Sequence, residues 1–486
     1  MKVEYMKILI LAKDIPPYVC IPGDTQRVVL FSYYLIKKGH EVAVIGSGRR
    51  VNVYNGPIWW EEYLNKVKIF PLLPGGLLKY IDFKKEKIIK KNSKEIYSYD
   101  LQINDDISKN KNGAKKKLFK NLIWSKMIYR LIRKIYNNLF IFGDDGILEV
   151  PSLKKYLSKI INDLKPDILI VSTPPHSWLR IIPWVKYQYP TLPLIIDFRD
   201  GWTSTGLFRA KSFIRKCWQD YIEKRVILSA SGLVFVSPGL KKFYFNKYNK
   251  NLPYSEIVFN GYNESLWNSI DAKRIDTEFL IHKHRPCIIK HIGGLSFSLE
   301  TFRSPYNIFL VLESCLKKGL ISSNDFILSF TGFIDKTKIL NIFPLLKPMI
   351  QINDPVSPLE ALIEMKTTDL LLIIHSKEEG AEEVLTGKIF DYLRVEKPIL
   401  AVTTSNCGIR KFLAKMDIGI WADINNLEDI SKKIINILKI FKSDEWYDWC
   451  KENTISSSKI SKYSREFQYG KFEKYIVKIV NNKIKE

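Results

Sequence analysis

Cysteines are few in this sequence, and their spacing excludes the usual cysteine-based sites. There are six in 486 residues, with no CxxC pair and no metal-ligand spacing: Cys20, Cys217, Cys287, Cys315, Cys407 and Cys450. In a chain of this length, such scattered residues are typical of reduced, mostly buried thiols. We therefore expect a cytoplasmic protein without a disulfide framework, and we expect no metal site.

Long apolar runs are also missing. Nowhere do 18 apolar residues follow one another, so we expect no transmembrane helix, and any membrane contact must be peripheral. The apolar run near the N-terminus is followed at once by Asp14, Pro16 and Pro17, and it is too short for the core of a signal peptide. We interpret this run as the first strand of the fold.

Acidic residues are scarce relative to basic ones. The chain has 51 Asp and Glu against 76 Lys and Arg, which gives a net charge of +25. This excess predicts attraction to an anionic partner, such as nucleic acid, anionic lipid headgroups or a phosphorylated substrate. No helix-turn-helix, zinc-finger or RNP-like motif accompanies the charge, so nucleic acid is not the expected partner.

Strand and helix patterns alternate along most of the chain. Residues 7–12 form an apolar run of strand length, residues 28–38 have helical spacing, and residues 41–46 form the next strand. The alternation returns at residue 156 and again at residue 287, which is typical of doubly wound α/β domains. We predict two Rossmann-like domains of α/β class that face each other across a cleft. Their predicted bounds are 1–270 and 271–445, with C-terminal helices at 446–486 that pack back on the first domain.

Residues 51–150 interrupt this alternation with a basic insertion. Between Lys109 and Lys134 there are ten Lys or Arg and no acid, and apolar residues recur there at three- and four-residue spacing. Such a pattern predicts a basic amphipathic helix, which is suited to an anionic membrane surface. A solvated lysine-rich insertion is the alternative.

Two polar loops follow strands of the first half, where ligands gather in doubly wound sheets. In the first loop, His176 is a candidate acid, base or hydrogen-bond donor, or else a loop residue that packs beside Trp178. In the second, Asp197 and Asp200 flank Arg199. These two acids either bind substrate hydroxyls or form ion pairs with Arg199, and the spacing favours the ion pairs. It is not the DxD spacing of a metal-dependent sugar-transfer site.

In the second half, Gly293 and Gly294 end the first predicted strand, and Arg303 follows downstream. Glycines at such a point let backbone amides approach a phosphate, and an arginine can bind the same group with two parallel hydrogen bonds. The pattern indicates an anion site, although a glycine pair alone also occurs in many turns.

A denser group of polar residues follows at the start of a later helix. Thr386 and Gly387 precede Lys388, where free amides and the helix dipole favour an anion and the lysine adds a full charge. The segment is not a Walker A motif, because the upstream glycine is missing. Glu383 and Asp391 stand on either side, placed to hold sugar hydroxyls around a phosphate. The alternative for Asp391 is a solvated helix position.

On these segments the chain resembles the retaining glycosyltransferase family 4, which has the GT-B fold. Residues 172–176 and 197–202 resemble the two loops of the family's acceptor domain, and residues 386–400 resemble its donor-domain signature. Gly23 matches a flexible glycine-containing loop after the first strand, and the pair at 260–261 matches the end of the family's first domain. The similarity extends loosely over nearly the whole chain.

The resemblance implies roles for these residues. Glu383 would touch the transferred sugar, Asp391 would hold the nucleotide ribose, and Arg303, Lys388 and the amides near Gly294 would stabilise the departing diphosphate. It also implies that no metal and no cofactor is needed. We take the catalytic candidates to be His176, Glu383, Lys388 and Arg303. The substrate-binding candidates are Gly23, Asp197, Arg199, Asp200, Gly293, Gly294, Thr386, Gly387 and Asp391.

The implied function is transfer of a hexose, with retention, from a nucleotide-diphosphate sugar to a glycan or polyprenyl-diphosphate-linked acceptor. This would serve bacterial surface polysaccharide synthesis, in the cytoplasm or at the inner face of the cell membrane. The second acid is Asp391 rather than the family's Glu, Glu396 stands where a Gly is common, and the Phe-Gly before Glu383 is absent. These departures leave open a non-catalytic GT-B-like partner subunit. A nucleotide-sugar epimerase, which shares the fold, and a basic nucleic-acid- or membrane-binding protein are further alternatives.

Overall fold

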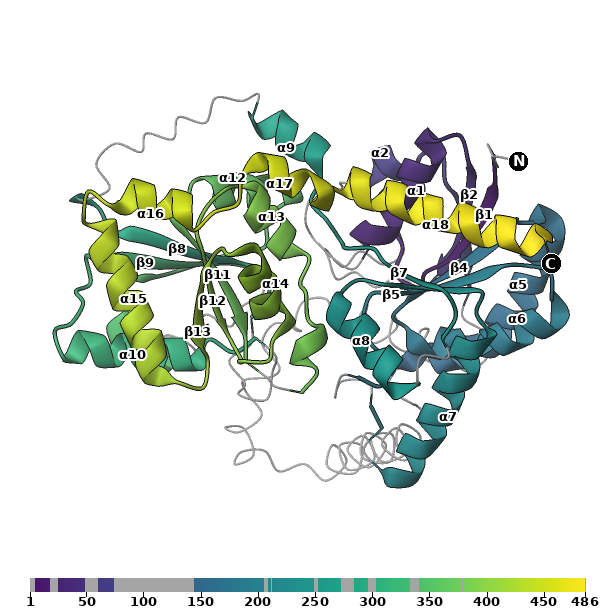
Figure 1. The fold of residues 1–486 in the computed structure, drawn as a ribbon, viewed down its shortest axis with the longest axis horizontal. Helices are drawn as coiled ribbons and strands as arrows, with labels where there is room; N and C mark the ends of the chain where they lie inside the picture. Colours follow the sequence, from purple (N-terminus) through teal and green to yellow (C-terminus); the bar gives the residue numbers. More distant parts are fainter. Residues whose placement is uncertain are drawn as a thin grey trace, which may run out of the picture.

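The computed structural model describes residues 5–17, 25–48, 60–73, 144–204, 209–210, 212–248, 252–271, 284–295, 303–332, 341–376 and 379–485. In this part of the chain, the helices and strands form two α/β domains that lie beside each other (Figure 1). The predicted basic amphipathic helix between Lys109 and Lys134 lies outside the described residues, and so does Gly23.

The first domain is built on a parallel sheet. Within the described residues its order is β3-β2-β1-β4-β5-β6-β7. The strands are β1 (Lys7–Leu11), β2 (Glu41–Ser47), β3 (Lys68–Leu72), β4 (Ile168–Thr173), β5 (Leu194–Phe198), β6 (Gly232–Phe235) and β7 (Ser255–Ile257). The order reverses between β1 and β4, which pair in parallel. Such a reversal opens a crevice at the carboxyl ends of the strands.

Both faces of this sheet are covered, because successive strand residues point to opposite faces. In β4, Leu169 and Val171 pack under α5 (Val150–Leu164), α6 (Ile182–Gln188), α7 (Phe213–Ser229) and α8 (Pro238–Lys247). Ile168 and Ile170 pack against α1 (Gln26–Lys37), α2 (Glu61–Leu64) and the C-terminal helix α18 (Arg465–Lys485). The ring of Phe31 on α1 stacks on Phe472 of α18 at 4.5 Å, and Figure 1 shows the two helices side by side.

The second domain repeats the architecture. Its described strands form a parallel sheet of order β10-β9-β8-β11-β12-β13, which again reverses at its centre. They are β8 (Cys287–Ile292), β9 (Phe326–Thr331), β10 (Ile350–Asn353), β11 (Leu370–His375), β12 (Ile399–Thr403) and β13 (Ile420–Asp423). One face packs against α10 (Tyr306–Lys317), α15 (Leu427–Phe441) and α16 (Trp446–Glu452). The other packs against α9 (Glu264–Asp271), α12 (Pro358–Lys366), α13 (Lys388–Arg394), α14 (Gly408–Met416) and α17 (Ser457–Ile460).

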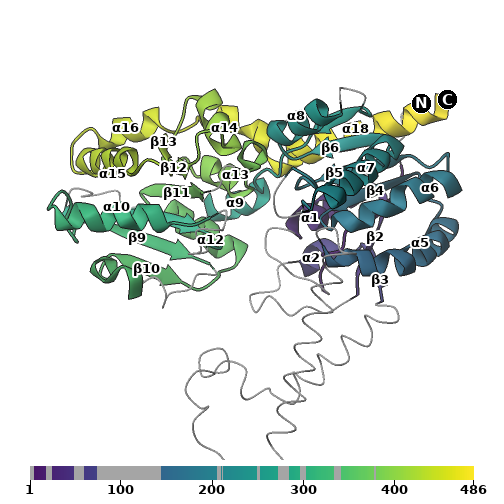
Figure 2. The same ribbon diagram turned by 90° about the horizontal axis from the view of Figure 1, so that it is seen from below.

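The end of the chain joins the two domains. Trp446 of α16 and Ile460 of α17 belong to the two cores of the second domain, whereas Ile476 of α18 is buried in the first. Figure 2 shows this last segment crossing from one domain to the other. Among the residues described above, no helix has both the length and the apolar composition needed to cross a membrane.

Candidate functional site between the two domains

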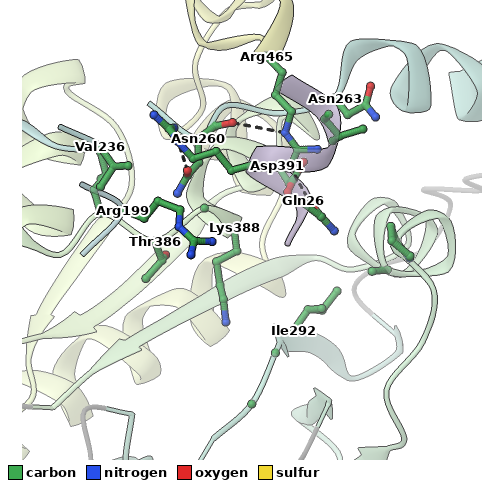
Figure 3. A pocket seen from close by; sticks show the side chains of 18 of the residues that line it. Gln26, Arg199, Val236, Asn260, Asn263, Ile292, Thr386, Lys388, Asp391 and Arg465 are labelled. Carbon is green, nitrogen blue, oxygen red and sulfur yellow. Dashed lines mark hydrogen bonds between the residues drawn. The ribbon is translucent and has the colours of Figure 1, made fainter. Parts of the chain in front are cut away.

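A cavity of about 1020 Å³ lies between the domains and is lined by residues of both. Most of the predicted site residues meet there, although they come from distant parts of the chain. Those that line the cavity are Arg199, Asp200, Gly293, Gly294, Arg303, Glu383, Thr386, Gly387, Lys388 and Asp391. His176 and Asp197 do not line it. Figure 3 shows the cavity from close by, with Thr386 and Lys388 at the start of α13.

Lys388, the first residue of α13, is held by a histidine that the sequence did not single out. Its Nζ lies 3.1 Å from Nε2 of His291 in β8. The Nδ1 of His291 lies 2.9 Å from the carbonyl oxygen of Leu372, which can only accept, so Nδ1 carries the proton and Nε2 accepts from Lys388. The pairing therefore requires a neutral imidazole.

Burial makes the charge on Lys388 costly in this setting. Burial and the nearby Arg303 hold the pKa of Lys388 well below its usual range. Burial and the charge of Lys388 likewise hold the pKa of His291 well below its usual range. An anion bound beside Lys388 and Arg303 would offset this cost, because an opposite charge favours the protonated amine. The electrostatics of this corner therefore favour a negatively charged ligand.

Gly293 leaves room for the lysine. Its φ of +122° is rarely adopted by other residues, and a Cβ at this position would lie 2.6 Å from the Nζ of Lys388. The preceding residue, Ile292, donates its backbone N–H to the hydroxyl of Tyr392 at 3.0 Å, which ties the end of β8 to α13. The strand end and the helix start are thus held together around the ammonium group.

Glu383 is the most perturbed carboxyl group of the cavity. It ends the short 3₁₀ helix Ala381–Glu383, and only 9% of the residue is exposed. Burial, helped by the charges of Glu223 and Asp200, raises its pKa to about 8, and the Ser204 hydroxyl opposes this shift. At neutral pH the carboxyl group is therefore mostly protonated, and it can donate a hydrogen bond to a sugar oxygen.

The two domains touch at this residue. The Oγ of Ser237, the N-cap of α8, donates to the backbone carbonyl of Glu383 at 2.6 Å. Gly239 allows the approach, since a Cβ there would lie 1.9 Å from the carbonyl oxygen of Glu382. A Cβ on Gly201 would lie 2.8 Å from Oε2 of Glu383. Glycines of the first domain thus make room for the segment that carries the acid.

Asp391 lies half-buried on α13, near the start of the C-terminal helix. Burial raises its pKa to about 6, and the charge of Arg465 opposes the shift. Arg465 reaches into the cavity from α18, and its Nη2 donates to Gln26 Oε1 at 2.9 Å (Figure 3). Arg465 was missed by the sequence analysis, because it stands alone in a polar tail far from any motif.

The prediction that Asp197 forms an ion pair with Arg199 is wrong. Asp197 is instead bound by Arg27, whose Nη2 and Nε lie 2.9 and 3.0 Å from its two carboxyl oxygens, and both side chains are buried. Arg199 donates to the carbonyl oxygens of Thr173 and Pro174. The reason is strand geometry: Asp197 points to the same face as Ile195, which packs against α1, where Arg27 lies.

Arg27, which lines the cavity, was also missed. Its Nη1 donates to Oδ1 of Asn260 at 3.2 Å and to the carbonyl oxygen of Val258 at 3.1 Å. The first helix is thereby joined to the end of the first domain at the cavity wall. In the sequence, the Asn260–Gly261 pair marked the end of the first domain, but it did not indicate that Arg27 would bind Asn260 there.

His176 lies behind the cavity wall. Its side chain is fully buried, and its Nε2 donates to the carbonyl oxygen of Asp200 at 3.0 Å. Its ring stacks on Trp202 at 5.9 Å between centroids, and burial lowers the pKa of the imidazole. In this arrangement His176 supports the loop that presents the exposed Asp200 carboxylate to the cavity. Within the described part of the chain, no cluster of three or more His, Cys, Asp or Glu side chains could hold a metal ion.

Comparison with known proteins gives matches in structure but not in sequence. No protein-family model matches the chain, and no curated protein matches it. The chain is similar to sucrose-phosphate synthase from Thermosynechococcus elongatus, with a TM-score of 0.59 and 9% identity over 98% of this chain and 100% of that one.

Two further solved structures cover nearly the whole chain. WaaG, a glycosyltransferase involved in lipopolysaccharide biosynthesis, has a TM-score of 0.56 and 11% identity over 96% of this chain and 99% of that one. Anabaena HepE, solved with UDP and glucose, has a TM-score of 0.53 and 12% identity over 97% and 99%. Identities this low carry the fold alone. The structural matches and the two parallel sheets together confirm the prediction of an α/β protein with the GT-B fold.

Proposed function

We propose that the chain is a glycosyltransferase that moves a hexose from a nucleotide-diphosphate sugar onto an acceptor. The observation that carries the proposal is a cavity between two doubly wound domains that is lined by Lys388, Arg303, Glu383 and Asp391, all of the second domain. Cations placed beside two carboxyl groups match a ligand that joins a diphosphate to hydroxyl-bearing rings.

The diphosphate would bind at the start of α13. Lys388 and Arg303 would contact its oxygens, and the amides near Gly294 and Gly387 would add hydrogen bonds. Negative charge grows on these oxygens as the sugar departs, so cations held in place before the reaction stabilise the transition state. The low pKa of Lys388 supports this placement, because the amine gains most from an anionic neighbour.

The two carboxyl groups would contact the remaining parts of the donor, which are the ribose and the transferred sugar. Asp391, next to Arg465, would hold the ribose hydroxyls of the nucleotide. Glu383 would donate a hydrogen bond from its protonated carboxyl group to the transferred sugar. HepE, which shares the fold, was solved with UDP and glucose. By analogy this supports a nucleotide sugar as the donor here. We further propose that the reaction needs no metal and no cofactor.

The acceptor would enter from the first domain, where Asp200 and Arg199 line the cavity. We propose a glycan or a polyprenyl-diphosphate-linked acceptor and same-face attack by its hydroxyl group, which retains the configuration of the transferred sugar. WaaG, of the same fold, acts in lipopolysaccharide biosynthesis, which supports a role in bacterial surface polysaccharide synthesis. The reaction would take place in the cytoplasm, at the inner face of an anionic membrane.

The test begins with binding. Thermal unfolding is followed with UDP-, GDP-, ADP- and CMP-sugars on the wild type, on Lys388→Ala and on Lys411→Ala. Lys411 is the matched control, because it is an exposed lysine of the second domain that pairs with Glu382. We expect stabilisation by one nucleotide class, lost in Lys388→Ala and kept in Lys411→Ala. Absence of any stabilisation would contradict the proposed donor site.

Turnover then separates the alternatives. The nucleotide sugar that binds is incubated with and without glycan and lipid-linked acceptors, and the products are identified by mass spectrometry. Release of nucleoside diphosphate with a glycosylated acceptor is the expected result. Conversion of the sugar without an acceptor would identify an epimerase. Binding without turnover would identify a non-catalytic subunit.

A further inference from the structure

One helix of the first domain presents apolar side chains to solvent along a continuous stripe. On α7, exposed residues recur at intervals of four, three, four and three positions, so they lie on one side of the helix. The large apolar side chains among the exposed residues of the helix are Phe213 (78% exposed), Ile214 (78%), Trp218 (52%), Tyr221 (52%) and Leu228 (49%). Isolated exposed apolar residues are ordinary, but five along one side of a single helix of 17 residues are not.

The charges on α7 are segregated in the same way. Lys224 and Arg225 lie on the exposed side, among the apolar residues. Of the two acids of the helix, Glu223 is fully buried, and the Asp220 side chain is 36% exposed. Both pair with Lys247 of α8. The outer side of α7 therefore combines aromatic and aliphatic groups with cations, and both acids of the helix are paired with Lys247.

The inner side of α7 holds the loop that leads to the cavity. Glu223 accepts from the Thr203 hydroxyl at 2.7 Å, and Gln219 accepts from the backbone N–H of Ala210 at 2.8 Å. The loop that follows the cavity-lining Asp200 and Gly201 is thus fastened to the back of the exposed helix. Figure 1 shows α7 at the lower edge of the first domain, far from α18.

We infer that the outer side of α7 is a docking surface for an anionic lipid bilayer. The axis of the helix would lie parallel to the membrane plane. Trp218 and Tyr221, whose rings stack at 5.9 Å, suit the headgroup level, where amphipathic rings reside. Phe213 and Ile214 would reach the acyl boundary, and Lys224 and Arg225 would contact lipid phosphates. The net charge of +25 acts in the same direction.

A second copy of the chain fits this surface less well. In a twofold dimer the same stripe would face itself, so Lys224 and Arg225 of one copy would meet those of the other, while the acids of the helix are already paired with Lys247. A bilayer with anionic headgroups satisfies both the apolar and the cationic part. The position of the acceptor at the membrane rests on the proposed function; the lipid contact itself does not.

The test is sedimentation with vesicles of phosphatidylcholine, with and without phosphatidylglycerol, at low and high salt. It compares the wild type, the double variant Ile214→Glu/Trp218→Glu, and Tyr447→Glu. Tyr447 is the control, because it is an aromatic residue of the second domain that is 67% exposed. We expect salt-sensitive binding of the wild type to the anionic vesicles, at least tenfold weaker binding of the double variant, and unchanged binding of Tyr447→Glu.

Three results would overturn the inference. These are no binding of the wild type to anionic vesicles, equal binding by the double variant, or a concentration-dependent dimer that the double variant abolishes. Stabilisation by nucleotide sugars is measured on the same samples and should be equal in wild type and double variant. If nucleotide sugars do not stabilise the wild type, the proposed donor site is contradicted, whereas the lipid result stands. Failure of the proposed function and failure of the lipid contact can therefore be told apart.

Cys217 offers an independent readout, because it is exposed on the same side of α7. In a Cys20→Ser/Cys450→Ser background, which removes the partly exposed Cys450, a polarity-sensitive fluorophore attached at Cys217 should shift its emission to the blue when phosphatidylglycerol vesicles are added. An unchanged spectrum with bound vesicles would place the membrane contact elsewhere and would overturn the assignment to α7.

Discussion

The hydroxyl of Ser237 in the first domain donates a 2.6 Å hydrogen bond to the backbone carbonyl of Glu383 in the second. The Oγ of Ser237 also accepts a hydrogen bond from the backbone N–H of Leu240 at 3.1 Å, so this side chain caps α8 as well. One side chain therefore stabilises a helix and positions the segment that carries the buried acid. The assembly of the cavity depends on how closely the two domains approach each other at this point.

Ser237→Ala should weaken donor binding as well as lower stability. Loss of an N-cap costs about 1 kcal/mol, and the missing contact between the domains should raise the KM for the donor severalfold. Asn426→Ala is the matched control, because Asn426 caps α15 away from the cavity. Both variants should lower the Tm, and only the first should change donor affinity. Equal donor affinity in both would show that the contact does not shape the cavity.

Replacement of Lys388 by Met should separate stability from binding. Donor affinity should fall about 10- to 100-fold, since a hydrogen bond to a charged group contributes about 1.5–3 kcal/mol. Stability without the donor should stay level or rise, because the folded state holds this amine at a pKa well below its usual range. Calorimetric titration and urea unfolding measure the two quantities. A large loss of stability would mean that Lys388 supports the fold rather than a ligand.

Glu383→Gln should remove a pH dependence of stability. In the folded protein the carboxyl group keeps its proton up to a pKa of about 8, whereas the usual value is 4.5. Between these values the folded state binds more protons than the unfolded chain, so the free energy of unfolding falls as pH rises. At pH 8.5 the variant should be more stable than wild type by roughly 4–5 kcal/mol, with a difference under roughly 1 kcal/mol at pH 5. Denaturant titrations measure the free energy of unfolding of both proteins at each pH. If it changes with pH by the same amount in wild type and variant, the raised pKa of Glu383 is contradicted.

Asp197→Asn should be costly, because it leaves the buried guanidinium of Arg27 without its carboxylate partner. Removal of one member of a buried ion pair costs about 3–5 kcal/mol. The double variant Arg27→Met/Asp197→Asn should recover part of this loss, which a double-mutant cycle by urea unfolding would measure. Arg199→Met serves as the control and should show no coupling with Asp197, because Arg199 bonds to backbone carbonyls. Additive effects at residues 27 and 197 would contradict the pairing.

The fold was predictable because its signals are local. The apolar run of β1 and the helical spacing of α1 depend on residues a few positions apart, and burial of both faces of a parallel sheet imposes that pattern. The helix start at Lys388 was predictable for the same reason, since a loop, a helix start and a lysine adjoin in the sequence. Asp391 was placed correctly beside it, one turn into the same helix.

The contacts that give the cavity its chemistry were not predictable in this way. Arg27 and Asp197 are 170 residues apart, Lys388 and His291 are 97 apart, and Arg465 reaches Gln26 across 439 residues. Local spacing placed Arg199 beside Asp197, but the face of β5 to which Asp197 points decided its partner. The sequence by itself determined the two doubly wound domains and the residues of the helix start. Only the tertiary structure decided which charges meet, because strand order and domain approach bring together segments whose spacing along the chain carries no record of the contact.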